Sequence, residues 1–334
     1  MNTTLGDLAQ SFMLQRRGAA LKHDIHRLTQ ELSTGRVADT KSVLAGNFSY
    51  LTDIERDAKA LQGYKVATTE AAQFADTMQN TLERIQDNSS DLSNAMLLIS
   101  TSAVETILPQ VVADSRANLG NLVSSLNVDF GGRSLFAGAA TDTAPLVSDD
   151  AILTGLTAAV AGQTPAADIF AAAQAWFDDP AGFRAAVYQG SDTSLSPFAL
   201  SDTDRLSIDI RADDPVLRDL MMNTALGAIV SDAALGLADT IQRDVIAQAG
   251  QNLLGGQDQM TKLRADIGFS QSRIEDVSTR NAVQTTSLEF ARSALLAADP
   301  YETATKLEDV QFQLQSLYSV TVRLSELSLL NFMR

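Results

Sequence analysis

The sequence predicts a mainly α protein: an elongated rod of long antiparallel coiled-coil or bundle helices contributed by both chain ends, with a small α/β or β insert in the middle. Three observations predict this fold class. Apolar residues recur at steps of three or four near both ends of the chain. Two internal segments carry heptad repeats. A stretch between them is punctuated by glycine and has neither pattern.

Residues 1–33 are expected to form the first helix. The residues that share one face of this helix are Leu14, Leu21, Ile25, Leu28 and Leu32. The helix should end near Ser33-Thr34-Gly35, because glycine is favoured just after a helix C-terminus. A loop with a turn signal at Gly46-Asn47 follows, and a second helix begins by residue 56.

Residues 57–106 carry the clearest heptad. Its two seams are Ala71, Met78, Ile85, Leu92 and Ile99, with Ala75, Leu82, Ser89 and Met96. Their small side chains predict tight packing in a multi-helix bundle. Pro109 should break or kink the helix, which resumes to about Leu126.

The middle of the chain changes character after residue 126. Arg133 to Ala137 reads as a short strand or turn between glycines. Alanine-rich pieces then alternate with turn signals, and Asp204 to Arg211 alternates polar and apolar residues as a strand would. Residues 146–205 are therefore expected to form the insert.

Helix returns after the insert. Asp214-Pro215 is a cap-and-proline helix start, and Gly250 to Gly256 is expected to break this helix. Residues 257–297 carry a second heptad, with seams at Met260, Ile267, Ile274, Leu288 and Leu295 and at Leu263, Val277 and Ala291. Asn281 occupies a seam position, where a polar residue can fix register.

The last helix should begin at Asp299-Pro300 and run to the end of the sequence. The residues of its apolar stripe are Leu307, Val310, Leu314, Leu317, Val320, Leu324, Leu327 and Leu330. This stripe needs a partner, and the first helix is the candidate. We expect three parts: residues 1–45 with 297–334 as a terminal coiled coil, 46–145 with 206–296 as a helical rod, and 146–205 as a surface insert.

Composition excludes several classes of protein. The net charge of −16 and the absence of a basic run disfavour nucleic-acid and anionic-membrane binding. The chain has no cysteine, which excludes disulfides and thiolate chemistry. No cleavable signal or membrane span is visible in the sequence. These features alone predict a soluble cytoplasmic protein.

No residue pattern indicates an enzyme, a metal site or a cofactor. His23 and His26 share one helical face but lack a third ligand. The glycine clusters match no phosphate-binding or dinucleotide motif. Two of the three aspartate pairs, Asp178-Asp179 and Asp213-Asp214, precede proline, which is typical of turns and helix starts.

Two segments at opposite ends of the chain resemble the flagellin superfamily. Leu28 to Arg36 (LTQELSTGR) resembles the N-terminal flagellin signature, and Tyr318 to Phe332 (YSVTVRLSELSLLNF) resembles the flagellin C-terminus. Three further segments are similar to the hook-filament junction proteins of that superfamily, those of the hook-associated protein 3 type. They are Gly132 to Gly138 (GRSLFAG), Tyr188-Gln189-Gly190, and Ala212 to Asp219 with its Ala-Asp-Asp-Pro start. The resemblance covers roughly residues 1–145 and 185–334.

The resemblance implies a non-enzymatic structural role in the bacterial flagellum, joining hook to filament. It implies export by the flagellar type III apparatus without a cleaved signal, and therefore an extracellular location. The expected partners are further copies in a helical ring or layer, the first hook-associated protein, flagellin, and a cytoplasmic export chaperone. Terminal helices should pair in assembly through Leu14, Leu21, Ile25, Leu28, Leu32, Leu314, Leu317, Leu324, Leu327 and Leu330. The alternatives are a filament-forming flagellin and a cytoplasmic coiled-coil adaptor.

Overall fold

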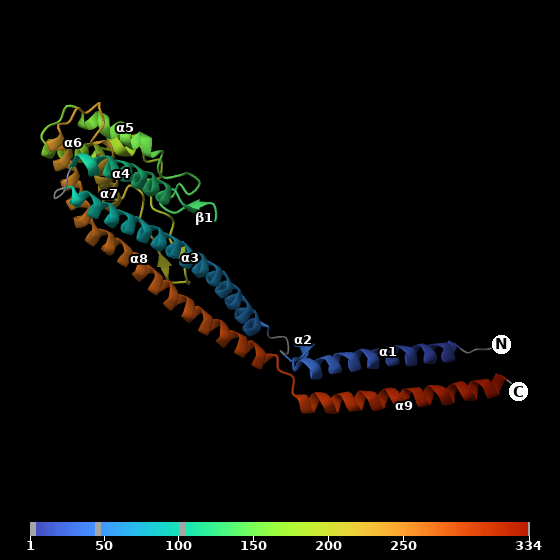
Figure 1. The fold of residues 1–334 in the computed structure, drawn as a ribbon. Coiled ribbons are helices and arrows are strands. Elements are labelled where there is room, and N and C mark those ends of the chain that lie inside the picture. Colours follow the sequence, from blue (N-terminus) through green and yellow to red (C-terminus); the bar gives the residue numbers. More distant parts are fainter. Residues whose placement is uncertain (1–4, 44–47, 100–103, 333–334) are drawn as a thin grey trace. The chain divides into compact units, whose positions relative to one another are not determined.

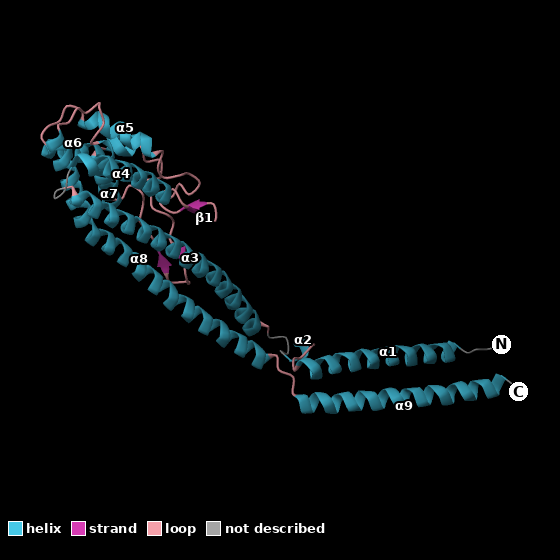
Figure 2. Ribbon diagram, viewed as in Figure 1, coloured by secondary structure: helices cyan, strands magenta, loops and turns pink. Residues whose placement is uncertain are grey.

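The computed structural model describes residues 5–43, 48–99 and 104–332, and it confirms a mainly α fold with two small antiparallel strand pairs (Figures 1 and 2). The elements are α1 (Leu5–Thr34), α2 (Thr40–Val43), α3 (Ser49–Leu98), α4 (Val104–Leu126), β1 (Asp129–Phe130), β2 (Arg133–Ser134), α5 (Asp149–Val160), α6 (Ala166–Asp178), the π-helical turn η1 (Pro180–Arg184), β3 (Phe198–Ala199), β4 (Arg205–Leu206), α7 (Pro215–Ile229), α8 (Asp239–Leu295) and α9 (Pro300–Phe332). The chain packs as two units. The terminal unit comprises residues 1–61 and 283–334, and the central unit comprises residues 62–282.

The terminal unit pairs α1 with α9 in antiparallel fashion, with both chain ends on the same side of the pair (Figure 1). The turn after α1 and the turn before α9 are joined by backbone hydrogen bonds. The Val37 amide donates to the Leu296 carbonyl at 2.9 Å, and the Ala298 amide donates to the Gly35 carbonyl at 2.9 Å. Gly35 has a φ of +65°, the left-handed conformation expected after a helix C-terminus.

The predicted start of α9 is confirmed by its cap. The Asp299 carboxylate accepts hydrogen bonds from the amides of Tyr301 at 2.8 Å and Glu302 at 3.1 Å. These amides have no partner within the helix, so the cap satisfies them. Asp214 caps α7 in the same way by accepting from the Val216 amide at 3.0 Å.

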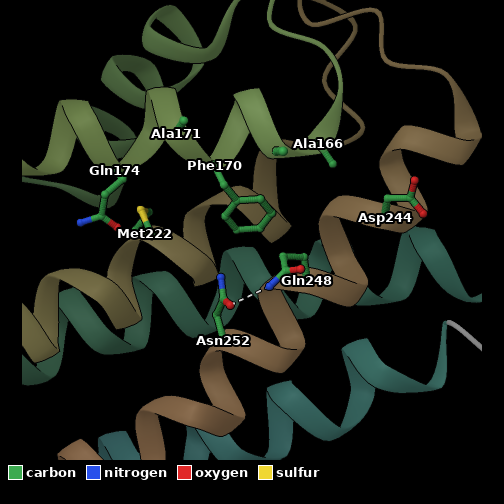
Figure 3. Close-up of a pocket in the computed structure, with 9 residues that line it drawn as sticks. Ala166, Phe170, Ala171, Gln174, Met222, Asp244, Gln248 and Asn252 are labelled. Atoms are coloured by element: carbon green, nitrogen blue, oxygen red, sulfur yellow. Dashed lines mark hydrogen bonds between the residues drawn. The ribbon is translucent and has the colours of Figure 1, made fainter.

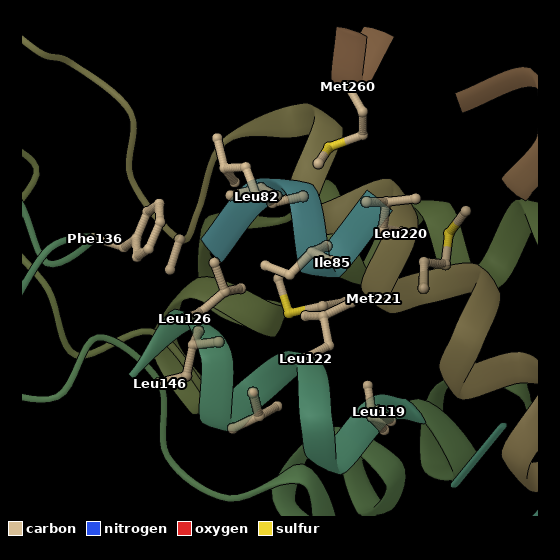
Figure 4. Close-up of a cluster of buried hydrophobic side chains, with 14 of the residues drawn as sticks. Leu82, Ile85, Leu119, Leu122, Leu126, Phe136, Leu146, Leu220, Met221 and Met260 are labelled. Atoms are coloured by element: carbon tan, nitrogen blue, oxygen red, sulfur yellow. The ribbon is translucent and has the colours of Figure 1, made fainter. Parts of the chain in front are cut away.

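The core of the central unit is built on α3 and α8, which lie side by side and antiparallel. All nine predicted seam residues of the first heptad are buried. From α8 the seam residues Met260, Ile267, Ile274 and Val277 are also buried. Helices α4 and α7 pack on each other beside this seam, and their leucines and methionines complete one hydrophobic cluster (Figure 4).

Asn281 is buried in the α8 seam and forms a hydrogen bond to the insert. Its side-chain amide donates to the Leu200 carbonyl at 2.8 Å, just after β3. Two arginines of α8 reinforce the contact through Asp204 before β4, with Arg280 at 2.7 Å and Arg273 at 3.6 Å. The polar seam residue therefore fixes where the β3–β4 hairpin lies on α8.

Two predicted breaks are wrong in position, the one at Pro109 and the one at Gly250 to Gly256. The first heptad helix was expected to reach residue 106, but α3 ends at Leu98, and Pro109 lies inside α4. Near the start of α4 a proline removes only one backbone hydrogen bond, so the helix continues through it. The Gly46-Asn47 turn lies outside the described residues.

The expected break at Gly250 to Gly256 is also wrong, because α8 passes through all three glycines without interruption. The chain turns earlier, between α7 and α8, where Gly236 has a φ of +57°. Gly250 instead allows α8 to pack closely against α3. The Ser93 hydroxyl of α3 donates to its carbonyl at 2.8 Å, and a Cβ at this position would lie 2.9 Å from Met96 Cβ.

The predicted strand from Asp204 to Arg211 is shorter than expected. Only Arg205 and Leu206 pair, with Ala199 and Phe198. Ile208 and Ile210 are buried alternately along an extended segment, which explains the alternation without a ladder. Between β2 and β3 the middle of the chain also contains the helices α5 and α6.

Paired glycine substitutions in α8 test the close packing of α3 and α8. Gly250→Ala should destabilise the protein by about 1–3 kcal/mol, since its methyl group would overlap Met96 and approach the Ser93 carbonyl. Gly255→Ala has open space around it and should stabilise the helix by up to about 1 kcal/mol. Urea unfolding followed by circular dichroism measures both, and a loss of stability in Gly250→Ala no larger than in Gly255→Ala would contradict the packing argument.

Candidate assembly surface

The paired helices α1 and α9 position the residues that the sequence assigns to assembly. Leu21 and Leu28 are buried between the helices, and Leu14 and Ile25 are half-buried beside them. On α9, Leu314 and Leu317 are half-buried. Leu32 instead faces solvent. Leu324, Leu327 and Leu330 lie within α9, but their side chains are outside the described part of the structure.

Gly18 faces α9 at Leu317. A Cβ at this position would lie 3.4 Å from Leu317 Cδ2, which is ordinary contact. One turn further along α1, the Lys22 ammonium lies 5.9 Å from the centre of the Tyr318 ring, within cation–π range. The two apolar stripes predicted from opposite ends of the sequence therefore meet in one helix pair.

Large apolar side chains are exposed mainly on the terminal unit. Among the described residues, sixteen are substantially exposed, and twelve of these belong to this unit: Phe12, Met13, Leu32, Phe48, Tyr50, Val283, Phe290, Tyr301, Phe312, Tyr318, Val320 and Val322. The other four, Val66, Leu98, Leu254 and Phe269, belong to the central unit, although that unit contains more residues. Such a concentration of large exposed apolar side chains in one unit is typical of a surface that contacts other proteins.

Sequence reasoning missed the aromatic residues of this surface. Phe290, Tyr301 and Phe312 lie outside the apolar stripes used to predict the helix pair. The sequence did contain a signal for this surface: these aromatic residues lie outside the apolar stripes, among mainly polar neighbours. Burying each of these rings against another subunit would contribute about 1.5–3 kcal/mol.

A second feature lies in the central unit, where three sequence motifs far apart in the chain converge. The GRSLFAG segment, the Tyr188-Gln189-Gly190 segment and the Ala-Asp-Asp-Pro segment are joined by backbone hydrogen bonds. The Ser191 amide donates to the Ala137 carbonyl at 2.8 Å, and the Ala212 amide donates to the Phe136 carbonyl at 2.9 Å. We call this arrangement the motif cluster.

Gly138 is required by the geometry of the motif cluster. Its φ of +62° lies in the left-handed region, and a Cβ would lie 2.6 Å from the Thr193 carbonyl oxygen. Any side chain would therefore be strained and would push the Ser191–Thr193 turn away.

The buried carboxylate of Asp213 is the electrostatic centre of the motif cluster. Arg184 donates to it through Nε at 3.1 Å and also through Nη2, and Arg211 donates through Nε at 2.9 Å. Arg211 also donates to the Asp192 carbonyl at 3.1 Å. The hydrogen bonds to Asp213 raise the pKa of both arginines, so both remain charged. Tyr188 is buried beside this group, and the burial raises its pKa to about 12.

The histidines and aspartates singled out in the sequence do not form a metal site among the described residues. That part of the chain includes no group of three or more potential metal ligands, and His23 and His26 are exposed on α1. The aspartate pairs serve caps and helix starts: Asp179 accepts from the Ala181 amide at 2.9 Å, and Asp149 and Asp150 begin α5. None of the described helices is long and apolar enough to span a membrane.

Comparison with known proteins gives two family matches. The bacterial flagellin N-terminal helical region matches residues 7–141, and the bacterial flagellin C-terminal helical region matches residues 255–333. Together they cover more than half of the chain. No curated protein matches it by sequence.

Two solved structures align with most of this chain. A structure assigned as a flagellar hook-associated protein of Vibrio parahaemolyticus aligns with a TM-score of 0.50 at 12% identity, covering 73% of this chain and 95% of that one. Bacillus cereus FlgL aligns with a TM-score of 0.49 at 14% identity, covering 72% of this chain and 98% of that one.

Substitution of Asp213 tests the motif cluster. Asp213→Asn should destabilise the protein by about 1–3 kcal/mol, because it removes the charge that two arginines share at a carboxylate whose side chain is 4% exposed. Asp192→Asn is the matched control. Its carboxylate is 76% exposed, and the loss of its 3.1 Å contact with Arg184 should cost less than about 1 kcal/mol. Thermal unfolding measures the difference, and equal effects would show that the buried carboxylate has no special role.

Proposed function

The chain belongs to the flagellin family and is a structural protein of the bacterial flagellum, and we propose that it joins the hook and its associated proteins to the flagellin filament. The observation that carries this proposal is the concentration of exposed apolar side chains in the terminal unit, twelve among the described residues, eight of which lie on α1 and α9. Such a surface needs other subunits to cover it. The motif cluster favours a junction protein over a filament flagellin, because its three segments are those that resemble the junction proteins.

The proposal includes the domain roles and partners expected from the sequence. The terminal helices pair through their leucine stripes and contact neighbouring copies in a helical ring or layer. The first hook-associated protein is the proximal partner, and flagellin is the distal one. The protein acts without cofactor, metal or catalysis.

Export belongs to the same proposal. The chain leaves the cell through the flagellar type III apparatus without a cleaved signal and functions outside the cell. Before export, a cytoplasmic chaperone holds the C-terminal helix, because its apolar face would otherwise promote aggregation. Membership of the flagellin family does not support the cytoplasmic adaptor considered above.

A filament-forming flagellin is the second candidate, since both family matches are to flagellin regions. The two functions differ in copy number and place. A junction protein is scarce and confined to one level of the flagellum, whereas a filament protein is abundant along its length.

Immunogold electron microscopy of intact cells separates the two candidates. Antibodies against residues 146–205 should label a single band between hook and filament, because a junction protein occupies one position along the axis. Label along the whole filament would indicate a filament flagellin. Label confined to the cytoplasm would overturn both.

Two phenylalanines on α8 give a matched test of the assembly surface. Phe290 in the terminal unit is 76% exposed and Phe269 in the central unit is 75% exposed. Neither substitution by serine should unfold the protein. Phe290→Ser should reduce incorporation into flagella about 10- to 100-fold, since each buried ring contributes about 1.5–3 kcal/mol to association. Phe269→Ser should have a much smaller effect. Quantitative blotting of sheared flagella measures incorporation, and equal behaviour of the two variants would contradict the proposed surface.

A further inference from the structure

A groove runs along α8 beside α6 and α7 in the central unit. It consists of two adjoining hollows of about 500 and 420 Å³, which share Gln174, Met222 and Asn252 in their walls. Figure 3 shows the larger of the two. The leucine stripes do not contribute to this groove, and of the motif segments only the end of the third one, at Val216 and Asp219, lines it.

The length of the groove suits an extended peptide. Along α8 its walls reach from Asp244 to Gln259. At 1.5 Å per residue this stretch of helix is about 22 Å long. An extended chain rises about 3.3 Å per residue, so six or seven residues would span the groove.

The floor of the groove is apolar and shallow. Phe170 projects from α6 toward Gln248 and Asn252 on α8, with Met222 nearby (Figure 3). Ala166 and Ala171 lie beside Phe170, and their small side chains leave room for a ligand. The aliphatic part of a long ligand side chain could lie on this floor, while its polar end reaches the polar side of the groove.

The side of the groove formed by α8 is polar, and it presents hydrogen-bond acceptors at Asp244 and Gln248. The side-chain amides form a directional chain: Gln248 donates to Asn252 at 2.9 Å, Asn252 donates to Asn223 at 2.9 Å, and Asn223 donates to the Asp219 carbonyl at 2.7 Å. The side-chain oxygen of Gln248 is left as an acceptor at the start of this chain. Asp244, one turn before Gln248 on α8, adds a carboxylate with no ion pair among the described residues.

The charge of the groove is negative. Its walls include Asp244 in one hollow and Asp219 in the other, and no lysine, arginine or histidine contributes to either wall among the described residues. Arg218, next to Asp219 in the sequence, is already bound to Asp178 at 3.2 Å. Burial raises the pKa of Asp219, and the charge of Asp178 raises it further. A bound cation would therefore relieve an unfavourable charge.

We infer that this groove binds a basic, extended segment of another protein. Arginine or lysine side chains of the segment would pair with Asp244 and Asp219, and their stems would lie on Phe170 and Met222. Arginine suits the site better, because its guanidinium donates several hydrogen bonds in one plane and also packs on an aromatic face. A second copy of this chain is disfavoured by its net charge of −16. The inference does not depend on the junction role.

Isothermal titration of the full chain with the peptide Gly-Arg-Gly-Gly-Arg-Gly tests the inference at about 0.15 M salt. The control peptide replaces both arginines with citrulline, which is neutral and has nearly the same shape. We expect the arginine peptide to bind at least tenfold more tightly than the citrulline peptide. Asp219→Asn combined with Asp244→Asn should weaken binding at least tenfold, and Phe170→Ala should weaken it severalfold.

A matched variant separates the groove from general electrostatics. Asp258→Asn combined with Asp266→Asn makes the same change in net charge at exposed sites on α8 outside the groove. It should leave binding nearly unchanged, and circular dichroism checks that every variant is folded. Equal losses in the two double variants, or equal binding of the citrulline peptide, would overturn the inference. Self-association of the chain that Asp219→Asn with Asp244→Asn abolishes would show a second copy as the occupant and would also overturn it.

Discussion

The close approach of α3 and α8 is the constraint on which the central unit depends. The two helices meet most closely at Gly250, where the Ser93 hydroxyl of α3 donates to the Gly250 carbonyl and a Cβ would lie 2.9 Å from Met96 Cβ. Along the rest of the seam the buried residues are larger apolar side chains, such as Met78 and Leu82 on α3 and Ile267 on α8. Together with α4 and α7 they form one closely packed hydrophobic cluster.

Two polar residues inside this apolar seam are satisfied by backbone carbonyls from distant parts of the chain. Ser93 donates to Gly250 and Asn281 donates to Leu200. A buried polar group without a partner would cost about 1–3 kcal/mol, so each of these bonds favours one placement of its partner over all others. The apolar contacts supply stability, and the two polar contacts select the register and the position of the hairpin.

Most of the features that the sequence predicted are determined locally, and the pairing of α1 with α9 is the exception, because each apolar stripe requires a partner. Helix periodicity, the Asp299 and Asp214 caps and the glycine after α1 depend on neighbouring residues, and the structure confirms them. The break expected at Gly250 is wrong because this glycine makes room for Met96, a residue far away in the chain, and does not end the helix. Periodicity shows which residues share a helix face but not whether another element covers that face, so the exposure of Phe290 could not be predicted. The meeting of the three motifs at Asp213 depends on contacts between distant segments, which periodicity does not report.

The backbone bonds that join Val37 to Leu296 and Gly35 to Ala298 have a kinetic consequence. They close a loop that contains most of the chain, and loop-closure entropy must be overcome before such contacts stabilise anything. A ribosome makes α1 before α9, so α1 lacks this partner until α9 has been made. The same holds for any process that moves the chain end first through a narrow passage. The terminal helix pair therefore cannot form until everything from α1 to α9 is present, and its formation reports that this whole stretch has arrived.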